Sequence, residues 1–107
     1  MNLRASLIKT FEDSYTVSQY RLYERWVMGH IDRICDGYNG RTWDWVKIGG
    51  KVFFKQGGFI TEAKIEGVII NVGISNSYVG FKTSQGNIWY LEGFKTKKEA
   101  KKFAEVD

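Results

Sequence analysis

A chain of 107 residues with 43% hydrophobic and 16% aromatic content has the size and composition of one globular domain, and its composition excludes a disordered chain. The only cysteine, Cys35, excludes an intramolecular disulfide and every multi-cysteine zinc motif, and no stretch is apolar enough for a signal peptide or a membrane span. A net charge of +4 admits nucleic acid or an acidic protein surface as a partner. We therefore expect a single domain over residues 1–107 in the cytoplasm.

Helical patterns occupy the first third of the chain. A short first helix is indicated by four apolar residues at helical spacing, which are Leu3, Leu7, Ile8 and Phe11. A second helix is predicted between Thr16, which has capping-box spacing to Gln19, and Gly37, which acts as a stop. Its apolar side is expected to hold Leu22, Tyr23, Trp26, Val27, Ile31, Ile34 and Cys35. Gly29 within this helix indicates a close packing contact.

After Gly40 the pattern changes to the alternation of β-branched and aromatic residues that is typical of strands. Five strands are predicted, at residues 41–48, 51–55, 64–74, 77–83 and 87–92. Short links between them, including residues 56–63 and Ser75-Asn76, favour antiparallel pairing. Thr96 and Glu99 indicate the start of a final helix. The expected fold is α+β, an antiparallel β-sheet meander of about five strands with an N-terminal helical part and a C-terminal helix.

The stretch YNGRTWDWVKIGGKVFF, residues 38–54, is the most aromatic part of the chain. If Gly49-Gly50 is a two-residue hairpin loop, Asp44 lies opposite Lys55 and Trp45 lies opposite Phe54. Because burial of one large ring is worth several kcal/mol, by area roughly 25 cal/mol per Å², the core is predicted to take Trp43, Trp45 and Phe54. The opposite face, with Asp44, Phe53 and Lys55, is either lightly covered or a partner surface.

Catalytic chemistry finds little support in the residue pattern. His30 is the only histidine, and Cys35 follows it by five residues, which turns the thiol about 140° away on a helix. A Cys-His pair within this helix is therefore excluded, and both are read as ordinary helix residues. No paired carboxylates, GxSxG, HExxH, phosphate loop or GxGxxG motif is present. We expect no enzyme activity, no catalytic residue, no metal and no cofactor.

Nucleic-acid binding is the alternative that composition keeps open. In residues 41–48, Arg41, Trp43, Trp45 and Lys47 alternate on one face, as on a base-stacking surface. Asp44 in the middle of that segment argues against such a platform, and no RNP1 pattern is present. The lysines at 95, 97, 98, 101 and 102 lie among acidic residues, so a solvated helix face explains them equally well.

The segment RICDGYNGRTWDWVKIGGKVFFKQGG resembles the central signature of the KlcA/ArdB antirestriction family, in which a helix leads through a turn into a Trp-bearing strand, a Gly-Gly hairpin and an aromatic strand. The resemblance covers residues 22–58, and the matched positions are Cys35, Tyr38, Gly40, Trp43, Gly49, Gly50, Phe53 and Phe54. The chain departs from the family at Arg41-Thr42, where the family tends to Gly-Tyr, and at Lys55-Gln56, where it often has Ala-Pro. The family's later part is helical, whereas this chain continues in apparent strands.

Members of that family are carried by plasmids and phages and counteract host restriction systems. The resemblance implies a counter-defence inhibitor, antirestriction or anti-CRISPR-like, that binds a host restriction or CRISPR effector protein and blocks it sterically. The expected partner-binding residues are Tyr38, Arg41, Asp44, Phe53, Lys55, Tyr78 and Lys82. The alternative is a small basic nucleic-acid-binding module, and an interaction protein without a defence role is a third interpretation.

Overall fold

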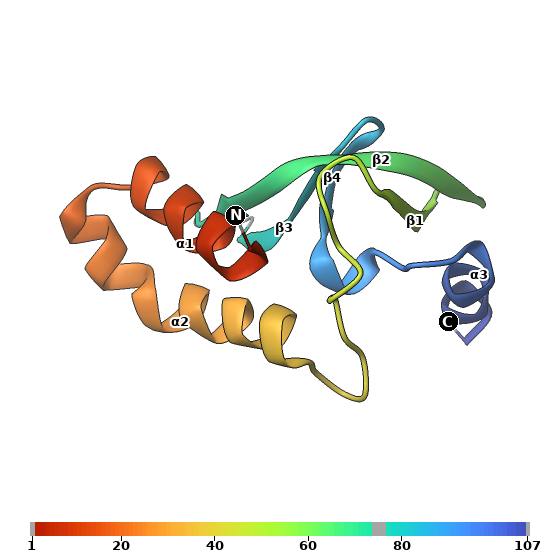
Figure 1. The fold of residues 1–107 in the computed structure, drawn as a ribbon, viewed down its shortest axis with the longest axis horizontal. Helices are drawn as coiled ribbons and strands as arrows, with labels where there is room; N and C mark the ends of the chain where they lie inside the picture. The colour runs from red at the N-terminus through yellow and green to blue at the C-terminus, as the bar shows by residue number, and fades with distance from the viewer. Residues whose placement is uncertain (1, 74–76, 107) are drawn as a thin grey trace. The chain divides into compact units, whose positions relative to one another are not determined.

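The computed structural model describes residues 2–73 and 77–106, with side chains of the last helix described as far as Phe103 (Figure 1). It confirms an α+β fold with helices at both ends of the strand region and a four-stranded antiparallel sheet in the order β1-β2-β3-β4, one strand fewer than expected. The elements are α1 (Leu3–Ser14), α2 (Val17–Asp36), β1 (Lys51–Gln56), β2 (Phe59–Asn71), β3 (Tyr78–Thr83), β4 (Gly86–Trp89), the 3-10 helix η1 (Tyr90–Glu92) and α3 (Lys97–Val106).

The chain divides into two compact units, and each is assembled from two separate segments. Unit 1 consists of Met1–Asp44 and Val68–Val79, and unit 2 of Trp45–Gly67 and Gly80–Asp107. Strands β2 and β3 therefore contribute residues to both units. The expectation of one domain over residues 1–107 stays a prediction.

Two helices with side-chain caps form most of unit 1. The side chain of Asn2 accepts a hydrogen bond from the Ala5 N–H (2.8 Å) at the start of α1. The predicted capping box opens α2, since the Gln19 N–H donates to Thr16 Oγ1 (3.2 Å) and the Thr16 N–H donates to Gln19 Oε1 (3.0 Å). Gly37, with φ of 100°, ends α2 as expected, because that backbone conformation favours glycine.

Ion pairs and a tyrosine hydroxyl tie the segments of unit 1 together. Arg4 of α1 reaches two carboxylates of α2, with Nη1 2.7 Å from Asp32 Oδ1 and Nη2 3.3 Å from Asp36 Oδ1. The Tyr15 hydroxyl donates to the Ile70 carbonyl (3.3 Å) and accepts from the Val72 N–H (2.8 Å). Residues 70–72 are thereby joined to the loop between α1 and α2.

The buried side of α2 differs from the predicted one. The core of unit 1 consists of Leu7, Phe11, Val27, Ile31, Ile34, Trp43, Ile70 and Val79. Leu22 and Trp26 were expected in this core, but they are 73% and 37% exposed. At 100° per residue they lie more than about 100° from the centre of the Val27–Ile31–Ile34 stripe, so the predicted apolar arc was too wide.

Unit 2 begins with a hairpin at the second Gly-Gly pair of the sequence. Strands β1 and β2 pair with Gln56 opposite Phe59, so Gly57-Gly58 forms the two-residue loop, with Gly57 at φ of 63°. The predicted link over residues 56–63 is thus mostly strand. Lys55 lies opposite Ile60, and Phe54 lies opposite Thr61.

The predicted hairpin at Gly49-Gly50 is wrong, and so is the strand at residues 41–48. A strand there would need the second edge of β1, but the Phe53 N–H donates to the Phe94 carbonyl (2.9 Å) and the Phe94 N–H donates to the Phe53 carbonyl (2.8 Å). Gly49 and Gly50 instead bond to Ile65 of β2, each through one backbone hydrogen bond of 2.8 Å.

The rest of unit 2 is a second hairpin followed by a helical turn and α3. Strands β3 and β4 pair with Thr83 opposite Gly86, and β4 ends at Trp89, so the strand predicted over residues 87–92 gives way to η1. The turn predicted at Ser75-Asn76 and the strand end predicted at Ile74 lie outside the described residues.

The core of unit 2 is apolar apart from one threonine, and it consists of Val52, Phe54, Ala63, Ile65, Phe81, Thr83, Ile88, Tyr90, Phe94 and Ala100. The predicted burial of Trp43 and Phe54 is confirmed, whereas Trp45 is only half-buried. The predicted start of α3 is also confirmed, since the Glu99 N–H donates to Thr96 Oγ1 (3.2 Å). In the described part of the chain, none of the helices combines the length and the apolar character needed to cross a membrane.

Candidate functional site

Two of the expected partner-binding residues face each other across a tight turn in unit 1. The Tyr38 N–H donates to the Arg41 carbonyl (2.9 Å), and the Arg41 N–H donates to the Tyr38 carbonyl (3.0 Å). Between them Asn39 and Gly40 have φ of 51° and 76°, which is the signature of the primed turn that Asn-Gly favours. The backbone of this turn is therefore held by its own sequence.

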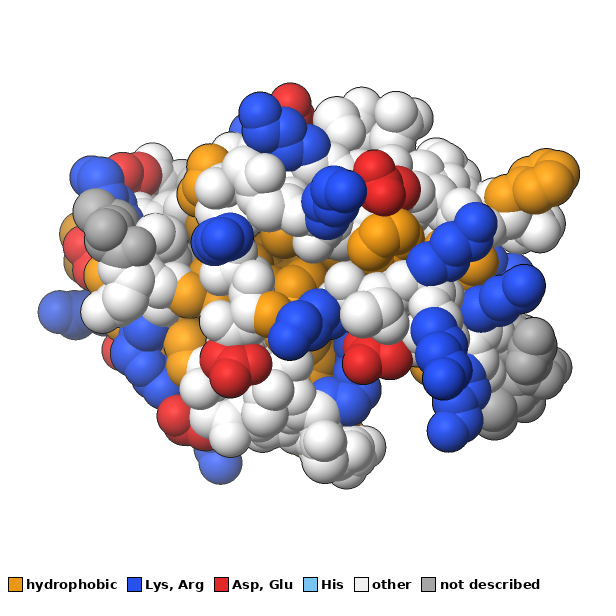
Figure 2. All heavy atoms as spheres, turned by 45° about the vertical axis from the view of Figure 1, so that its right-hand side comes forward, with side chains coloured by type: hydrophobic (Ala, Val, Ile, Leu, Met, Phe, Trp, Pro, Cys, Tyr) orange, Lys and Arg blue, Asp and Glu red, His pale blue; other side chains and the backbone are white. Residues whose placement is uncertain are grey.

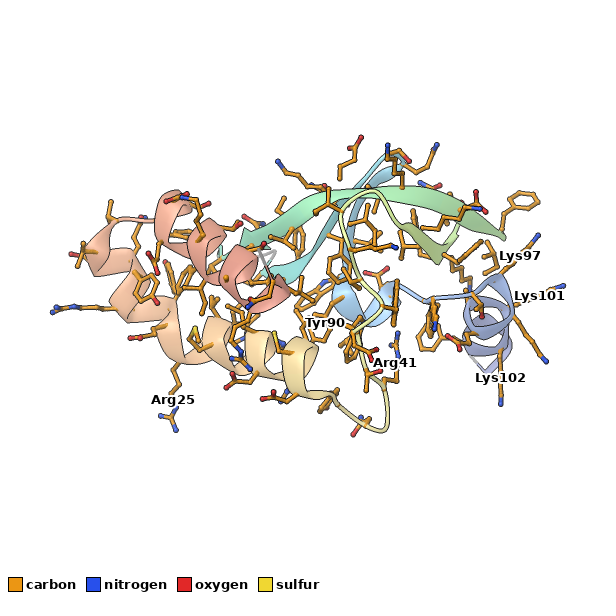
Figure 3. The ribbon with its side chains drawn as sticks, viewed as in Figure 1. Arg25, Arg41, Tyr90, Lys97, Lys101 and Lys102 are labelled. Atoms are coloured by element: carbon orange, nitrogen blue, oxygen red, sulfur yellow. The ribbon has the colours of Figure 1, made fainter. Side chains whose placement is uncertain are left out.

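Arginine side chains lie on aromatic rings on either side of the turn. The Arg33 guanidinium carbon lies 4.4 Å from the ring centre of Tyr38, and that of Arg41 lies 4.7 Å from the ring centre of Trp43. Such cation-π contacts are worth about 0.5–1 kcal/mol at exposed sites. Arg41 (Figure 3) is half-buried, and exposed Asp44 accepts a hydrogen bond from the Thr42 hydroxyl (3.0 Å).

The seven expected residues are divided between the two compact units. Tyr38, Arg41, Asp44 and Tyr78 belong to unit 1, whereas Phe53, Lys55 and Lys82 belong to unit 2. Residues 41–48 form no strand and the hairpin at Gly49-Gly50 is absent, so the predicted Asp44–Lys55 pairing is wrong, and Lys55 lies opposite Ile60 instead. Half-buried Phe53 lies opposite Glu62, and exposed Lys82 lies opposite Asn87.

A surface that the sequence interpretation missed runs along α2. We call it the outer face of α2 and define it by Leu22, Arg25, Trp26, Gly29 and Arg33. Leu22 and Trp26 are one helical turn apart and exposed, and a Cβ placed on Gly29 would have no heavy atom within 4 Å. The close packing contact expected at Gly29 is therefore not present among the described residues.

The outer face of α2 also carries two arginines, Arg25 and Arg33, and a ring contact holds Arg33. Arg33 is the residue that stacks on Tyr38, so its guanidinium is held in place before any partner arrives. Arg25 projects away from the helix (Figure 3). The signal in the sequence was the position of Leu22 and Trp26 on the helical wheel, outside the stripe of Val27, Ile31 and Ile34.

His30 and Cys35 both lie on α2, and both have a shifted pKa. The His30 ring packs against Trp26 with ring centres 4.5 Å apart, and burial together with the charge of Arg33 lowers the pKa of His30. Burial raises the pKa of the Cys35 thiol, which keeps it in the unreactive protonated form. Among the described residues, no three His, Cys, Asp or Glu side chains lie together as a metal site would require.

An open hollow of about 470 Å³ lies at the corner between α1 and α2. Its lining consists of Glu12, Tyr15, Val17, Tyr20, Arg21 and Glu24. Burial and the two glutamates raise the pKa of Tyr20, so its hydroxyl stays protonated. The lining of the hollow carries both charge signs, from Arg21 and the two glutamates.

The basic residues are divided between the two units by type. Unit 2 contains ten of the eleven lysines and no arginine, while unit 1 contains all five arginines. With ten cations and six carboxylates, unit 2 has a net charge of +4, whereas the six cations and six carboxylates of unit 1 cancel. Every lysine of unit 2 is exposed. Figure 2 shows Lys and Arg side chains gathered at the right of that view, where the part of the molecule that includes α3 comes forward.

Comparison with known proteins gives no significant match to a family model, a curated protein or a solved structure. The resemblance of residues 22–58 to the KlcA/ArdB signature stays a prediction.

Proposed function

We propose that this chain is a counter-defence protein that binds a host restriction or CRISPR effector protein and blocks it, with the outer face of α2 as its contact surface. The observation that carries the proposal is the exposure of Leu22 (73%) and Trp26 (37%) beside Arg25 and Arg33 on one helical face. The resemblance of residues 22–58 to an antirestriction signature supplies the class of partner.

The residue types of this face are those that dominate protein interfaces. Trp and Arg are enriched among the residues whose truncation weakens complexes most. Covering the exposed part of Leu22 would contribute roughly 1–2 kcal/mol, because full burial of a leucine side chain contributes about 1.5–3 kcal/mol.

Pre-organisation adds to the case for a protein partner. Arg33 is already stacked on Tyr38 at 4.4 Å, so it loses less rotamer freedom on binding than a free arginine would. The turn that carries Tyr38 is itself closed by two backbone hydrogen bonds of 2.9 and 3.0 Å. Gly29 leaves open space beside Trp26, into which a side chain or backbone of a partner fits.

The test is co-purification from bacteria that carry a type I restriction enzyme or a CRISPR effector complex, together with phage plating on the same cells. The wild-type chain is expected to retain a defence component and to raise plating of phage that the defence would restrict. The double variant Leu22→Ala/Trp26→Ala is expected to lose at least tenfold in affinity, which corresponds to about 1.4 kcal/mol. Val17→Ala is the matched control, because Val17 is 72% exposed but lies on another side of α2.

Three results would count against this reasoning. If no defence component is retained and plating does not change, the counter-defence function is wrong. If the double variant is retained as well as the wild type, the function stands but the outer face of α2 is not its surface. An equal loss in Val17→Ala would mean that general surface hydrophobicity, not this face, holds the partner.

A further inference from the structure

The proposed function does not use the ten exposed lysines of unit 2, which we call its lysine surface. All ten are exposed, and no arginine accompanies them. Within the described part of unit 2, the one ion pair joins Lys51 and Glu62, at 3.9 Å between Nζ and Oε1. At such exposure that pair contributes little, about 0–1 kcal/mol, so most of the positive charge is not neutralised by nearby carboxylates.

Four of these lysines are concentrated on α3. Lys97 and Lys101 form one row along the helix, and Lys98 and Lys102 form a second, each row with a spacing of four residues. Like charges at this spacing destabilise a helix by about 0.2–0.5 kcal/mol per pair. Lys97 and Lys98 also stand in the first turn, where the helix dipole disfavours cations. The arrangement reduces the stability of α3, and an anion bound along it would reverse that loss.

The opposite side of α3 contacts the rest of unit 2. Ala100 is buried, and Phe103, although 44% exposed, packs on Phe94 with ring centres 5.1 Å apart. Thr96 caps the helix start, because its Oγ1 accepts a hydrogen bond from the Glu99 N–H. The lysine rows therefore point away from the packed side, and Figure 3 shows Lys97, Lys101 and Lys102 extending outward from α3.

From this separation of charge we infer that unit 2 binds the phosphate backbone of nucleic acid through its lysines, with α3 at the centre of the contact, and does so without reading sequence. A phosphate backbone is a dense row of negative charges, and lysines that neutralise them release condensed counterions. Lysine binds phosphate as a point charge on a flexible stem, which suits a ligand whose charges repeat along its length.

Two other polyanionic partners fit the surface less well. Protein interfaces are depleted in lysine and enriched in arginine, whereas this surface has ten lysines and no arginine. A helix that lies in a membrane needs a free apolar face opposite its cations. On α3, Ala100 is buried and Phe103 packs on Phe94, so the described apolar surface of this helix is limited to the exposed part of one ring, 44% of Phe103.

The lack of arginine in unit 2 also bears on specificity. Proteins recognise guanine in the major groove mostly through arginine or lysine side chains. Arginine is suited to this contact because its planar guanidinium donates two parallel hydrogen bonds to the base. A surface of mobile lysines contacts phosphates in any sequence. The expected ligand is therefore nucleic acid of arbitrary sequence, bound with strong dependence on salt.

The test measures binding of fluorescently labelled 20-mer oligonucleotides, single-stranded and duplex, by anisotropy between 50 and 200 mM NaCl. If the four lysines of α3 each neutralise one phosphate, duplex affinity falls at least about 150-fold over this range, from a slope of −0.9 per phosphate. For the double variant Lys97→Gln/Lys101→Gln, the slope of log affinity against log salt concentration is expected to be about 1.8 less steep. Between 50 and 200 mM NaCl its affinity therefore falls by a factor about 12-fold smaller than the wild-type factor. Scrambling the oligonucleotide sequence is expected to change affinity less than threefold.

A charge-matched control separates local contact from net charge. Lys9→Gln/Arg21→Gln also removes two positive charges, but from exposed positions of unit 1. It is expected to leave the slope of log affinity against log salt concentration unchanged. Circular dichroism of both variants checks that the total helix content is unchanged. The inference is overturned if no binding occurs at 50 mM NaCl, if both double variants lower the slope equally, or if vesicles containing phosphatidylserine bind as tightly as the oligonucleotides. Failure here leaves the proposed function intact, because that function rests on α2 in unit 1.

Discussion

Replacing Gly29 by alanine tests the outer face of α2 through stability and binding at once. Gly29 is an interior residue of a 20-residue helix, and a Cβ there would meet no heavy atom within 4 Å. Alanine is therefore expected to stabilise the fold by about 0.8–1 kcal/mol, which is the difference in helix propensity between the two residues. In a urea titration followed by helical circular dichroism, the midpoint should rise by about 0.3–1 M for an unfolding slope of 1–3 kcal/mol per M.

Gly40 provides the matched control for this substitution. A Cβ on Gly40 also has open space around it, but its φ of 76° lies in the left-handed region. Gly40→Ala is therefore expected to destabilise the fold by about 1–2 kcal/mol, opposite in sign to Gly29→Ala. A lower urea midpoint for Gly29→Ala would refute the reasoning, since it would mean that this face of α2 is packed against something. If the partner contacts Gly29 closely, the same variant binds it more weakly while being more stable.

Three further changes probe other parts of the chain. Thr16→Ala removes the acceptor for the Gln19 N–H and should lower the free energy of unfolding by about 1 kcal/mol, seen as a lower urea midpoint. An unchanged midpoint would show that the cap does not stabilise the fold. Gly80→Ala places a Cβ against the backbone carbonyl of Ile88 and should destabilise the fold by about 1–3 kcal/mol, with a neutral result ruling out this close pairing of β3 and β4. Because burial lowers the pKa of His30 in the folded state, the unfolded state binds more protons once the pH falls below about 6.5, and stability is lost as the pH drops towards the folded pKa. His30→Gln should therefore show a smaller fall in melting temperature between pH 7.5 and 5.5 than the wild type, and an equal fall would assign the pH dependence to other groups.

The ends of α2 could be predicted from the sequence because they depend on interactions between residues close together in the chain. The cap of α2 depends on Thr16 and Gln19, three residues apart, and its end depends on the positive φ that Gly37 tolerates. The turn at Asn39-Gly40 is equally local, because both residues accept positive φ. These features involve contacts a few residues apart, so residue type and spacing were enough to predict them.

Strand pairing depended on contacts far apart in the sequence. The chain offers two Gly-Gly pairs beside aromatic strands, and residue type alone does not tell which one forms the hairpin. The choice follows from the bonds between Phe53 and Phe94, which occupy the other edge of β1. Burial of Trp43 was predicted correctly even though its strand was not, because the gain from burying a large ring does not depend on secondary structure.

The outer face of α2 was missed for a related reason. Leu22 and Trp26 are apolar, so a wide apolar side of α2 that includes them is predicted from residue type. Once the buried stripe is fixed by Val27 and Ile31, the same sequence places Leu22 and Trp26 outside it. The lysine surface of unit 2 could not be recognised from spacing, because β1, β2, β3 and α3 contribute to it from distant parts of the chain.

The hydrogen bonds of the Tyr15 hydroxyl can form only late during synthesis of the chain. Its two backbone partners, Ile70 and Val72, leave the ribosome more than fifty residues after it. During that interval α1 and α2 have no access to the strand residues that complete unit 1, so buried side chains such as Phe11 and Ile31 are covered only by neighbouring residues of the first segment, such as Tyr20 on Phe11. The nascent chain is thus expected to be a substrate for chaperones up to about residue 72, and a truncation before that point should yield a protease-sensitive product.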